Sequence, residues 1–154
     1  MLTVQPLSLE TVDLFAGCVT ALYAEDPGPV PMTRDRARSQ ALRMLGADDQ
    51  VWPFLIHWNS VATGHLILAS FWSNEFGGPM LFVDELYVSP SVRGQGVGRQ
   101  VLQWAVAWAR SHGFVRVELE VNRENARAHA LYTRCGFEDE HRDLLGIQVV
   151  PLPT

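Results

Sequence analysis

The chain lacks the features that mark secreted, membrane-spanning and metal-binding proteins. Two cysteines occur in 154 residues, Cys18 and Cys135, and they lie far apart without a motif, so we expect reduced thiols. No apolar run reaches the roughly 18 residues that a membrane span needs, and no basic segment opens the N-terminus as in a signal peptide. The five histidines show no metal-ligand spacing. We therefore expect a cytoplasmic chain that holds no metal and enters no membrane.

Basic charge is also scarce, since 12 Lys and Arg stand against 17 Asp and Glu, a formal net charge of -5. This balance argues against nucleic acid as the main partner. It mildly favours a small cationic substrate through electrostatic steering, although modest acidity also serves solubility alone. The length and the hydrophobic content of 47% fit one globular domain over residues 1–154.

Hydrophobic periodicity and turn residues predict alternating strands and helices. The expected strands are 3–4, 51–58, 61–71, 80–88 and 115–121, and a closing hairpin is expected from 137–143 and 145–150. The expected helices are 9–23, a second helix that Thr33 caps and that ends near Leu45, 97–112 and 124–135. The first long hairpin would turn at Asn59-Ser60. This order of elements predicts an α+β or mixed-sheet chain.

A glycine-rich run, Arg93-Gly94-Gln95-Gly96-Val97-Gly98-Arg99, stands between a predicted strand and a predicted helix. Such a turn presents unpaired N–H groups and the positive end of the helix dipole to an anion. The P-loop pattern fails because Gly98 is followed by Arg99-Gln100, and the dinucleotide fingerprint fails because the third glycine comes one residue early. The run therefore favours a diphosphate cradle, with a plain strand-to-helix turn as the open alternative.

Two motifs resemble those of the GNAT superfamily of N-acetyltransferases. Residues 93–98 match Arg/Gln-x-x-Gly-x-Gly/Ala, which binds the pyrophosphate of acetyl-CoA in that family. Asn125-Ala126 and the run from Leu131-Tyr132 to Gly136-Phe137 resemble the second motif of the family. The resemblance covers roughly residues 61–140. It implies acetyl-CoA as co-substrate and an α+β fold, with a central twisted, mixed, mostly antiparallel sheet of about 6–7 strands and about four helices, two on each side.

The resemblance also assigns residues to the cofactor. The strand before the motif would pair with the pantetheine arm, and a backbone N–H of Tyr87 or Val88, freed by a bulge before Pro90, would donate to the developing oxyanion. Asn125 would hold the pantetheine arm or cap its helix. The implied cofactor-binding residues are Leu86, Tyr87, Val88, Arg93, Gly94, Gln95, Gly96, Val97, Gly98, Arg99 and Asn125.

Tyr132 matches the tyrosine whose hydroxyl protonates the coenzyme thiolate in the family, although its place on an apolar helical stripe also fits packing alone. Three carboxylates compete as the general base. Glu120 lies twelve residues before Tyr132, a spacing that resembles the ribosomal-protein alanine acetyltransferases. The pair Asp84-Glu85 before Leu-Tyr-Val resembles diamine and polyamine acetyltransferases. We rank Glu85 and Glu120 ahead of Asp84, and deprotonation through water, without a single base, stays open.

The implied reaction is direct acetyl transfer to a primary amine. Acidic pairs at 25–26 and 84–85 favour a small cationic acceptor, such as a polyamine, a diamine or a basic amino acid. A peptide or protein N-terminus is the alternative acceptor, and a non-catalytic acyl-CoA-binding regulatory module is the alternative from another class. Many members of the family are dimers, and the tail 149–154 could pair with a partner in a homodimer.

Overall fold

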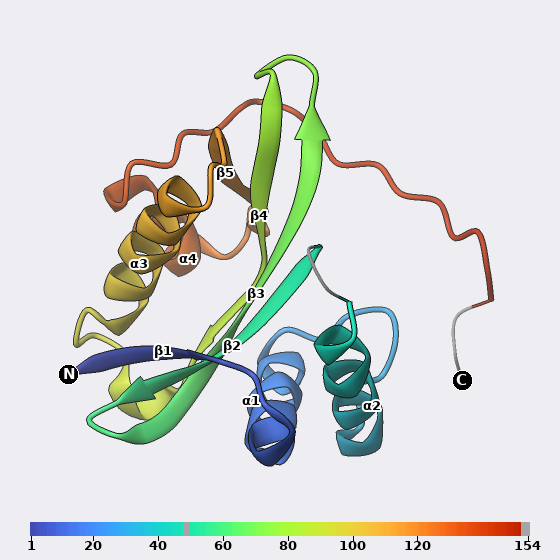
Figure 1. The fold of residues 1–154 in the computed structure, drawn as a ribbon, viewed down its shortest axis with the longest axis vertical. Helices are drawn as coiled ribbons and strands as arrows, with labels where there is room; N and C mark the ends of the chain where they lie inside the picture. The colour runs from blue at the N-terminus through green and yellow to red at the C-terminus, as the bar shows by residue number, and fades with distance from the viewer. Residues whose placement is uncertain (48–49, 152–154) are drawn as a thin grey trace.

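The computed structural model describes residues 1–47 and 50–151 of the chain, and its helices and strands follow the predicted order (Figure 1). The elements are β1 (Leu2–Pro6), η1 (Leu9–Thr11), α1 (Val12–Glu25), α2 (Arg34–Leu45), β2 (Val51–Trp58), β3 (Val61–Ser73), β4 (Gly78–Val88), η2 (Pro90–Val92), α3 (Val97–Ser111), β5 (Arg116–Leu119) and α4 (Ala126–Arg134). The hydroxyl of Thr33 accepts from the N–H of Arg36 at 3.2 Å and so caps α2, as predicted.

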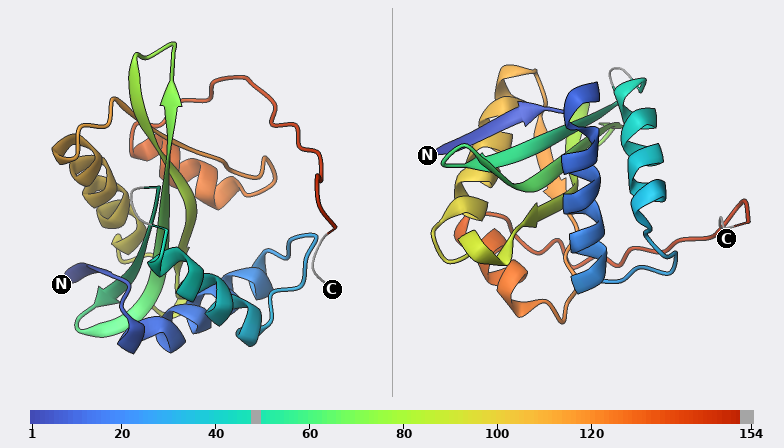
Figure 2. Two further views of the ribbon diagram at one scale, coloured as in Figure 1. Left: turned by 45° about the vertical axis from the view of Figure 1, so that its right-hand side comes forward. Right: turned by 90° about the horizontal axis from the view of Figure 1, so that it is seen from below.

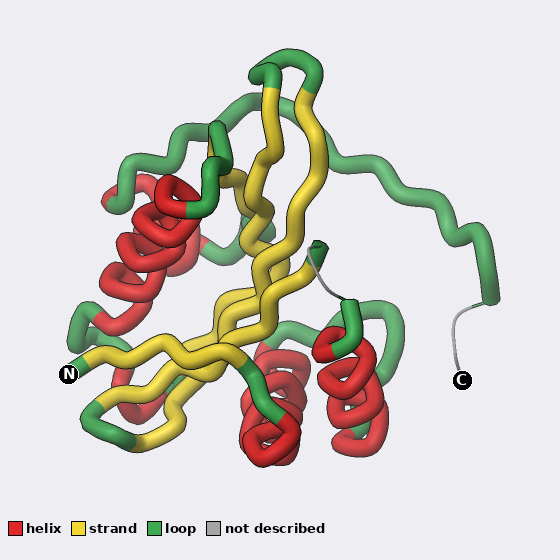
Figure 3. The backbone as a smooth tube through the Cα atoms, viewed as in Figure 1, coloured by secondary structure: helices red, strands yellow, loops and turns green. Residues whose placement is uncertain are grey.

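Five strands form one mixed sheet in the order β1-β2-β3-β4-β5 (Figure 3). The first four are antiparallel neighbours, and β5 pairs in parallel with β4. The predicted turn between β2 and β3 is confirmed: Asn59 and Ser60 have φ values of 50° and 68°. Positive φ at both central residues is the geometry that suits the right-handed twist of a two-residue hairpin.

The two faces of the sheet are covered by different helices (Figure 2). Buried residues of α3 pack with β2, β3 and β4 in one hydrophobic cluster, whereas α1 and α2 pack on the other face, against Leu55 and Ile67. Apolar positions recur on α3 at Val97, Val101, Ala105 and Ala109, which is the spacing of one helix face. The packing of α3 fixes the start of this helix beside the end of β4.

The bulge predicted just before Pro90 lies elsewhere. The register of β3 and β4 shifts between Ile67, opposite Glu85, and Leu68, opposite Val83, so Asp84 is the extra residue. The strands β4 and β5 are paired only over Met80–Val83 and Arg116–Leu119. A bulge bends its strand and increases the local twist, and the C-terminal half of β4 accordingly continues without β5 beside it.

The predicted closing hairpin is wrong in the part of the chain that the structure describes. Residues 135–151 form no strand, so the described sheet has five strands rather than six or seven. Residues 138–143 are all charged or histidine and offer no apolar face for packing, and His141 has a φ of 53°, which breaks an extended backbone. Residues 152–154 of the predicted tail lie outside the described residues.

Gly64 is a glycine of β3 with no room for a side chain. A Cβ on this residue would lie 2.0 Å from the carbonyl oxygen of Tyr87, which is backbone and cannot turn aside. We expect Gly64→Ala to lower the free energy of unfolding by at least about 2 kcal/mol, as overpacking strain does. In chemical denaturation Gly46→Ala serves as the control, because its Cβ makes only an ordinary contact at 3.7 Å. Equal midpoints for the two variants would contradict the predicted clash.

Candidate active site

A cleft of about 730 Å³ opens where β4 and β5 part. It is lined by the end of β4, the glycine-rich loop, the first turn of α3, the helix α4 and the last residues of α1. Ten of the eleven cofactor-binding residues that the sequence implies line this cleft, and Tyr132 lines it with them. The exception is Gln95, whose side-chain oxygen accepts from the indole N–H of Trp58 at 3.2 Å.

The glycine-rich loop leaves its backbone open toward this cleft. Gly94 and Gly96 have φ values of 78° and 79°, which L side chains rarely adopt. A Cβ on Gly98 would lie 3.1 Å from the side chain of Leu131, so glycine allows α4 to approach α3. The first N–H groups of α3 have no partner within the helix. Unpaired N–H groups and the positive end of the helix dipole are features that favour an anion, and Val97–Arg99 present both at the edge of the cleft.

Arg93 ties three segments together at the edge of the cleft. Its Nε donates to the carbonyl oxygen of Val88 at 2.6 Å, and its Nη2 lies 2.6 Å from a carboxylate oxygen of Glu25. The guanidinium also stands over the ring of Tyr87, 5.6 Å from its centroid. The side chain of Arg93 thus joins the end of β4 to the end of α1, while Arg99 adds positive charge along the cleft.

At the end of β4, every second backbone N–H group faces the cleft. The N–H of Ser89 donates to the carbonyl oxygen of Thr63 at 2.7 Å, so it faces β3. Backbone donors alternate along a strand that pairs on one side. The N–H of Tyr87 therefore also faces β3, and the N–H groups of Leu86 and Val88 face away from it. This side carries the part of β4 that β5 leaves unpaired.

Asn125 and Tyr132 both come from α4. The Oδ1 of Asn125 accepts from the N–H of Ala128 at 3.0 Å, which confirms the helix-cap role. The ring of Tyr132 packs edge-on against Phe137 with centroids 6.2 Å apart. Burial, and to a smaller extent the thiol of Cys135, raises the pKa of the Tyr132 hydroxyl. Tyr132 is therefore a protonated donor at neutral pH.

Glu85 is held by two hydrogen bonds from other elements. The hydroxyl of Tyr23 in α1 donates to its Oε1 at 2.7 Å, and Nε2 of His65 in β3 lies 2.9 Å from its Oε2. Burial by itself raises the pKa of Glu85, but the hydrogen bond and the attraction of His65, with the hydrogen bond of Tyr23, lower this pKa below its usual value. The carboxylate therefore stays charged on the α1 side of β4.

His65 is completely buried between two rings. Its centroid lies 5.2 Å from that of Phe15 and 6.0 Å from that of Tyr87. We assign Nε2 as the donor to Glu85, because an ionised carboxylate can only accept. Nδ1 of His65 has no hydrogen-bond partner among the described residues. Packing and this single bond thus fix the ring and, through it, the orientation of Glu85.

Asp84 is the extra residue of the bulge, and two other acidic side chains lie near its carboxylate. Partial burial, followed by repulsion from Glu85 and from Glu120, raises the pKa of Asp84. Glu120 does not line the cleft; it lines a second groove along β5. The structure therefore places the three predicted bases around the bulge and puts only Tyr132 of the predicted catalytic residues in the cleft itself.

Sequence reasoning missed Tyr23 and His65. His65 is a titratable side chain in the mostly apolar strand 61–71. A buried polar side chain needs a hydrogen-bond partner, so its position in this strand was a signal that could have identified it. Tyr23 carries no local signal, because its partner is 62 residues away. Burial and the hydrogen bond to Glu85 raise the pKa of Tyr23, so its hydroxyl remains a donor.

In residues 1–47 and 50–151, no group of three or more His, Cys, Asp or Glu side chains is arranged to hold a metal ion. Within the same residues, every helix is too short or too polar to cross a membrane.

Known proteins resemble this chain in sequence and fold. A 64-residue segment is 38% identical to an aminoglycoside N(6')-acetyltransferase type 1 of Stenotrophomonas maltophilia, covering 42% of each chain. The chain thus spans less than half of that relative, and 38% of an aminoalkylphosphonate N-acetyltransferase of Salmonella typhimurium. Over 140 residues it is 30% identical to glucosamine 6-phosphate N-acetyltransferase 1 of Oryza sativa subsp. japonica, which covers 86% of this chain and 80% of the rice protein.

Solved structures share the whole fold. An integron cassette protein from a salt-marsh metagenome superposes with a TM-score of 0.82 at 28% identity, over 97% of this chain and 91% of the other. An aminoglycoside N-acetyltransferase in complex with a CoA-linked bisubstrate analogue has a TM-score of 0.80 at 19% identity, over 97% and 99%. The model of the acetyltransferase (GNAT) family matches residues 16–137. The chain therefore belongs to the GNAT family of acetyltransferases.

Proposed function

We propose that this chain transfers the acetyl group of acetyl-CoA directly to the primary amine of a small cationic acceptor, such as a polyamine, a diamine or a basic amino acid. The observation that carries this proposal is that β4 leads from a site for an anion to a pair of carboxylates. The proposed anion site, at the start of α3, lies at one end of the cleft beside the end of β4. The carboxylates of Asp84 and Glu85 lie further back along the same strand.

The cleft fits acetyl-CoA in three respects. The N–H groups at the start of α3 and the open backbone at Gly94 suit a diphosphate. Leu86 and Val88 present unpaired backbone groups to an extended pantetheine arm, as a neighbouring strand would require. The N–H of Val88, rather than that of Tyr87, is then the donor to the thioester carbonyl oxygen.

In this proposal one carboxylate attracts the ammonium group and another accepts its proton. An amine with a pKa near ~10.4 must lose a proton at a cost of about 4.6 kcal/mol at pH 7 before it can attack. Glu85 keeps its charge and attracts the ammonium group, because two hydrogen bonds lower its pKa. Asp84, whose pKa is raised, is a stronger proton acceptor than an ordinary aspartate. Glu120 adds negative charge near Asp84.

Tyr132 supplies the proton that the leaving group needs. The neutral amine nitrogen forms a bond to the acetyl carbon as the carbon–sulfur bond breaks, and the hydroxyl of Tyr132 donates its proton to the sulfur. The acylated nitrogen gives its excess proton to water and becomes the neutral amide. The raised pKa of Tyr132 keeps its proton in place until then, and water returns a proton afterwards. The half-buried ring of Tyr132 faces the cleft beside the start of α3.

Gly94→Ala tests the anion site against a matched control. Gly94 and Gly113 have φ values of 78° and 79°, and a Cβ would meet nothing within 4 Å at either position. Both alanine variants therefore carry the same backbone strain, about 1–2 kcal/mol. We expect only Gly94→Ala to weaken CoA binding, by about tenfold or more in calorimetry, because only Gly94 lines the cleft. Equal CoA affinities in the two variants would contradict this site.

The acceptor is tested by thiol release from acetyl-CoA with a panel of amines. The chain has no lysine, so acetylation of its own lysine side chains cannot mimic turnover. We expect release with polyamines, diamines or basic amino acids and little release with peptide N-termini. Equal turnover of peptides would refute the cationic small-molecule acceptor. Saturable acetyl-CoA binding without release by any amine would favour the non-catalytic module.

A further inference from the structure

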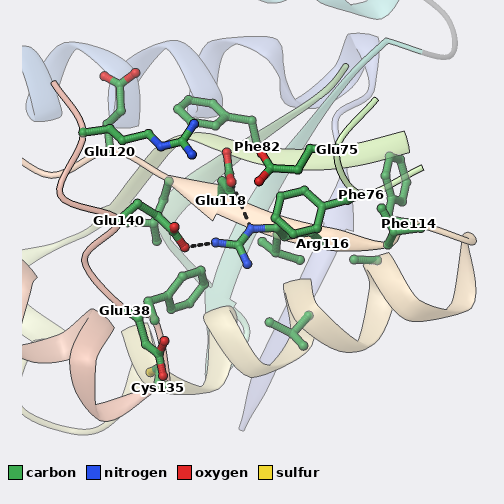
Figure 4. A pocket seen from close by; sticks show the side chains of 18 of the residues that line it. Glu75, Phe76, Phe82, Phe114, Arg116, Glu118, Glu120, Cys135, Glu138 and Glu140 are labelled. Carbon is green, nitrogen blue, oxygen red and sulfur yellow. Dashed lines mark hydrogen bonds and ion pairs between the residues drawn. The ribbon is translucent and has the colours of Figure 1, made fainter. Parts of the chain in front are cut away.

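Ion pairs bridge the walls of both the cleft and the groove along β5. In the groove, Arg116 pairs with Glu118 at 2.9 Å and reaches across to Glu140 on the segment that follows α4 (Figure 4). In the cleft, Arg93 at the start of the glycine-rich loop pairs with Glu25, the last residue of α1, at 2.6 Å. The second pair therefore lies where the coenzyme is proposed to bind, and a ligand that enters the cleft must meet it.

The positive charge of Arg93 is engaged within the protein. Its Nε donates to the carbonyl oxygen of Val88, its Nη2 bonds to Glu25, and its guanidinium lies over the ring of Tyr87. The side chain of Arg93 is 22% exposed and that of Glu25 is 41% exposed, so an incoming anion can reach the pair. A diphosphate at the start of α3 carries more negative charge than one carboxylate and would compete with Glu25 for the same guanidinium.

Glu25 is the partner that such a competition would displace. It ends α1, where the negative end of the helix dipole disfavours a carboxylate. Its other hydrogen bond among the described residues comes from the hydroxyl of Tyr87 and is long, at 3.4 Å. An anion that bonded to Arg93 would leave Glu25 without its positive partner, and the two negative groups would repel each other. Glu25 therefore opposes an anion in the cleft unless it moves away from Arg93.

A second pair of contacts places Glu25 beside Glu85. Tyr23, two residues before Glu25 on α1, donates to Glu85 at 2.7 Å. Tyr87, two residues after Glu85 on β4, donates to Glu25. The end of α1 and the end of β4 are thus joined by two successive bonds between a tyrosine and a glutamate. A carboxylate released from Arg93 would lie next to the one to which the proposed function assigns the ammonium group.

We propose that Glu25 changes partner when acetyl-CoA binds. Without the coenzyme it pairs with Arg93; with the diphosphate on Arg93 it binds a second positive charge of the acceptor. The second step rests on the proposed function, because it requires a cationic acceptor, whereas the first step concerns the coenzyme alone. Each ligand then favours the other, because the coenzyme frees the carboxylate that the amine uses. This arrangement selects a diamine or a polyamine over a monoamine.

Calorimetry with CoA tests the first step without any amine. We expect Glu25→Gln to bind CoA about two- to fivefold more tightly than the wild type, because it removes the competitor for Arg93. Asp26→Asn is the matched control, since it removes the same charge from the next residue, which also lines the cleft but forms no ion pair among the described residues. It should change the affinity less. Unchanged or weaker binding by Glu25→Gln, or equal tightening in both variants, would overturn the proposal.

A double-mutant cycle assigns this gain to Arg93. Arg93→Gln should weaken CoA binding, and the further change Glu25→Gln should then add no more affinity than Asp26→Asn adds in the same background. The gain expected for Glu25→Gln alone cannot come from misfolding, because misfolding would weaken binding. If Glu25→Gln tightened CoA binding as much without Arg93 as with it, the two anions would not compete for this guanidinium, and the change of partner would be wrong.

Thiol release with putrescine and with butylamine, which differ by one amino group, tests the second step. We expect the wild type to favour the diamine in kcat/KM by about tenfold, as a contact between opposite charges implies. Glu25→Gln should lose most of this preference, and Asp26→Asn should retain more of it. A wild type without the preference, or Glu25→Gln with all of it, would overturn the second step. Failure of every amine would overturn that step together with the proposed function, and the CoA titrations would still decide the first step.

Discussion

Tyr132→Phe is expected to lower kcat for amine acetylation by about 10²-fold or more, because it removes the group that we propose as the proton donor to the leaving sulfur. The phenyl ring retains the packing against Phe137. Affinity for CoA should change by less than about twofold, since the anion site at the start of α3 is untouched. Steady-state thiol release and calorimetry on the same preparation measure the two effects.

Tyr87→Phe is the matched control for this experiment. Tyr87 also lines the cleft, and its hydroxyl makes only a long bond of 3.4 Å to Glu25. We expect this variant to retain kcat within a few-fold, as loss of one weak hydrogen bond implies. If both variants lost activity equally, or if Tyr132→Phe remained fully active, Tyr132 would have a packing role alone.

Glu85→Gln is expected to lower kcat/KM for a cationic amine by about 10–100-fold. A hydrogen bond or contact with a charged partner contributes about 1.5–3 kcal/mol, and this variant removes the charge while it keeps the shape. The loss should fall mainly on amine affinity and leave CoA affinity unchanged, because Glu85 does not line the cofactor cleft. An unchanged KM for the amine would contradict the role of Glu85 as the charge partner.

Tyr23→Phe tests whether amine binding follows the ionisation of Glu85. The hydrogen bond from Tyr23 helps to lower the pKa of Glu85, so its removal raises that pKa. The amine stays cationic as the pH falls. Its binding is lost when Glu85 takes up a proton, because Glu85 then no longer carries the negative charge that attracts the amine. The pH at which amine affinity falls by half should therefore move upward in Tyr23→Phe. A downward shift or no shift would indicate that another carboxylate binds the amine.

The fold was largely predictable because its signals are local. Apolar spacing on α3, the cap at Thr33 and the turn at Asn59-Ser60 each lie within a few residues of the feature that they predict. The position of the bulge was not predictable in this way, because it depends on which residue of β3 faces Asp84. The closing hairpin was wrong because residues 138–143 are all charged or histidine and offer no apolar face for packing, and because His141 has a φ of 53°, which breaks an extended backbone.

In the candidate site too, the residues in local motifs were predictable and those with distant partners were not. Contiguous motifs placed the glycine loop, Asn125 and Tyr132 on one cleft. The setting of Glu85 depends on Tyr23 and His65, which are 62 and 20 residues away, and no periodicity connects them. Gln95 belongs to the motif, yet its side chain turns to Trp58, because a loop residue between two glycines can point to either side.

The most direct test of the account is binding of a polyamine–CoA bisubstrate conjugate, because it engages the anion site and the acidic group at once. We expect this conjugate to bind at least about tenfold more tightly than CoA, and Glu85→Gln to remove that gain while CoA binding persists. A peptide–CoA conjugate should bind no better than CoA. If the peptide conjugate bound as tightly as the polyamine conjugate, the proposed cationic acceptor would be wrong.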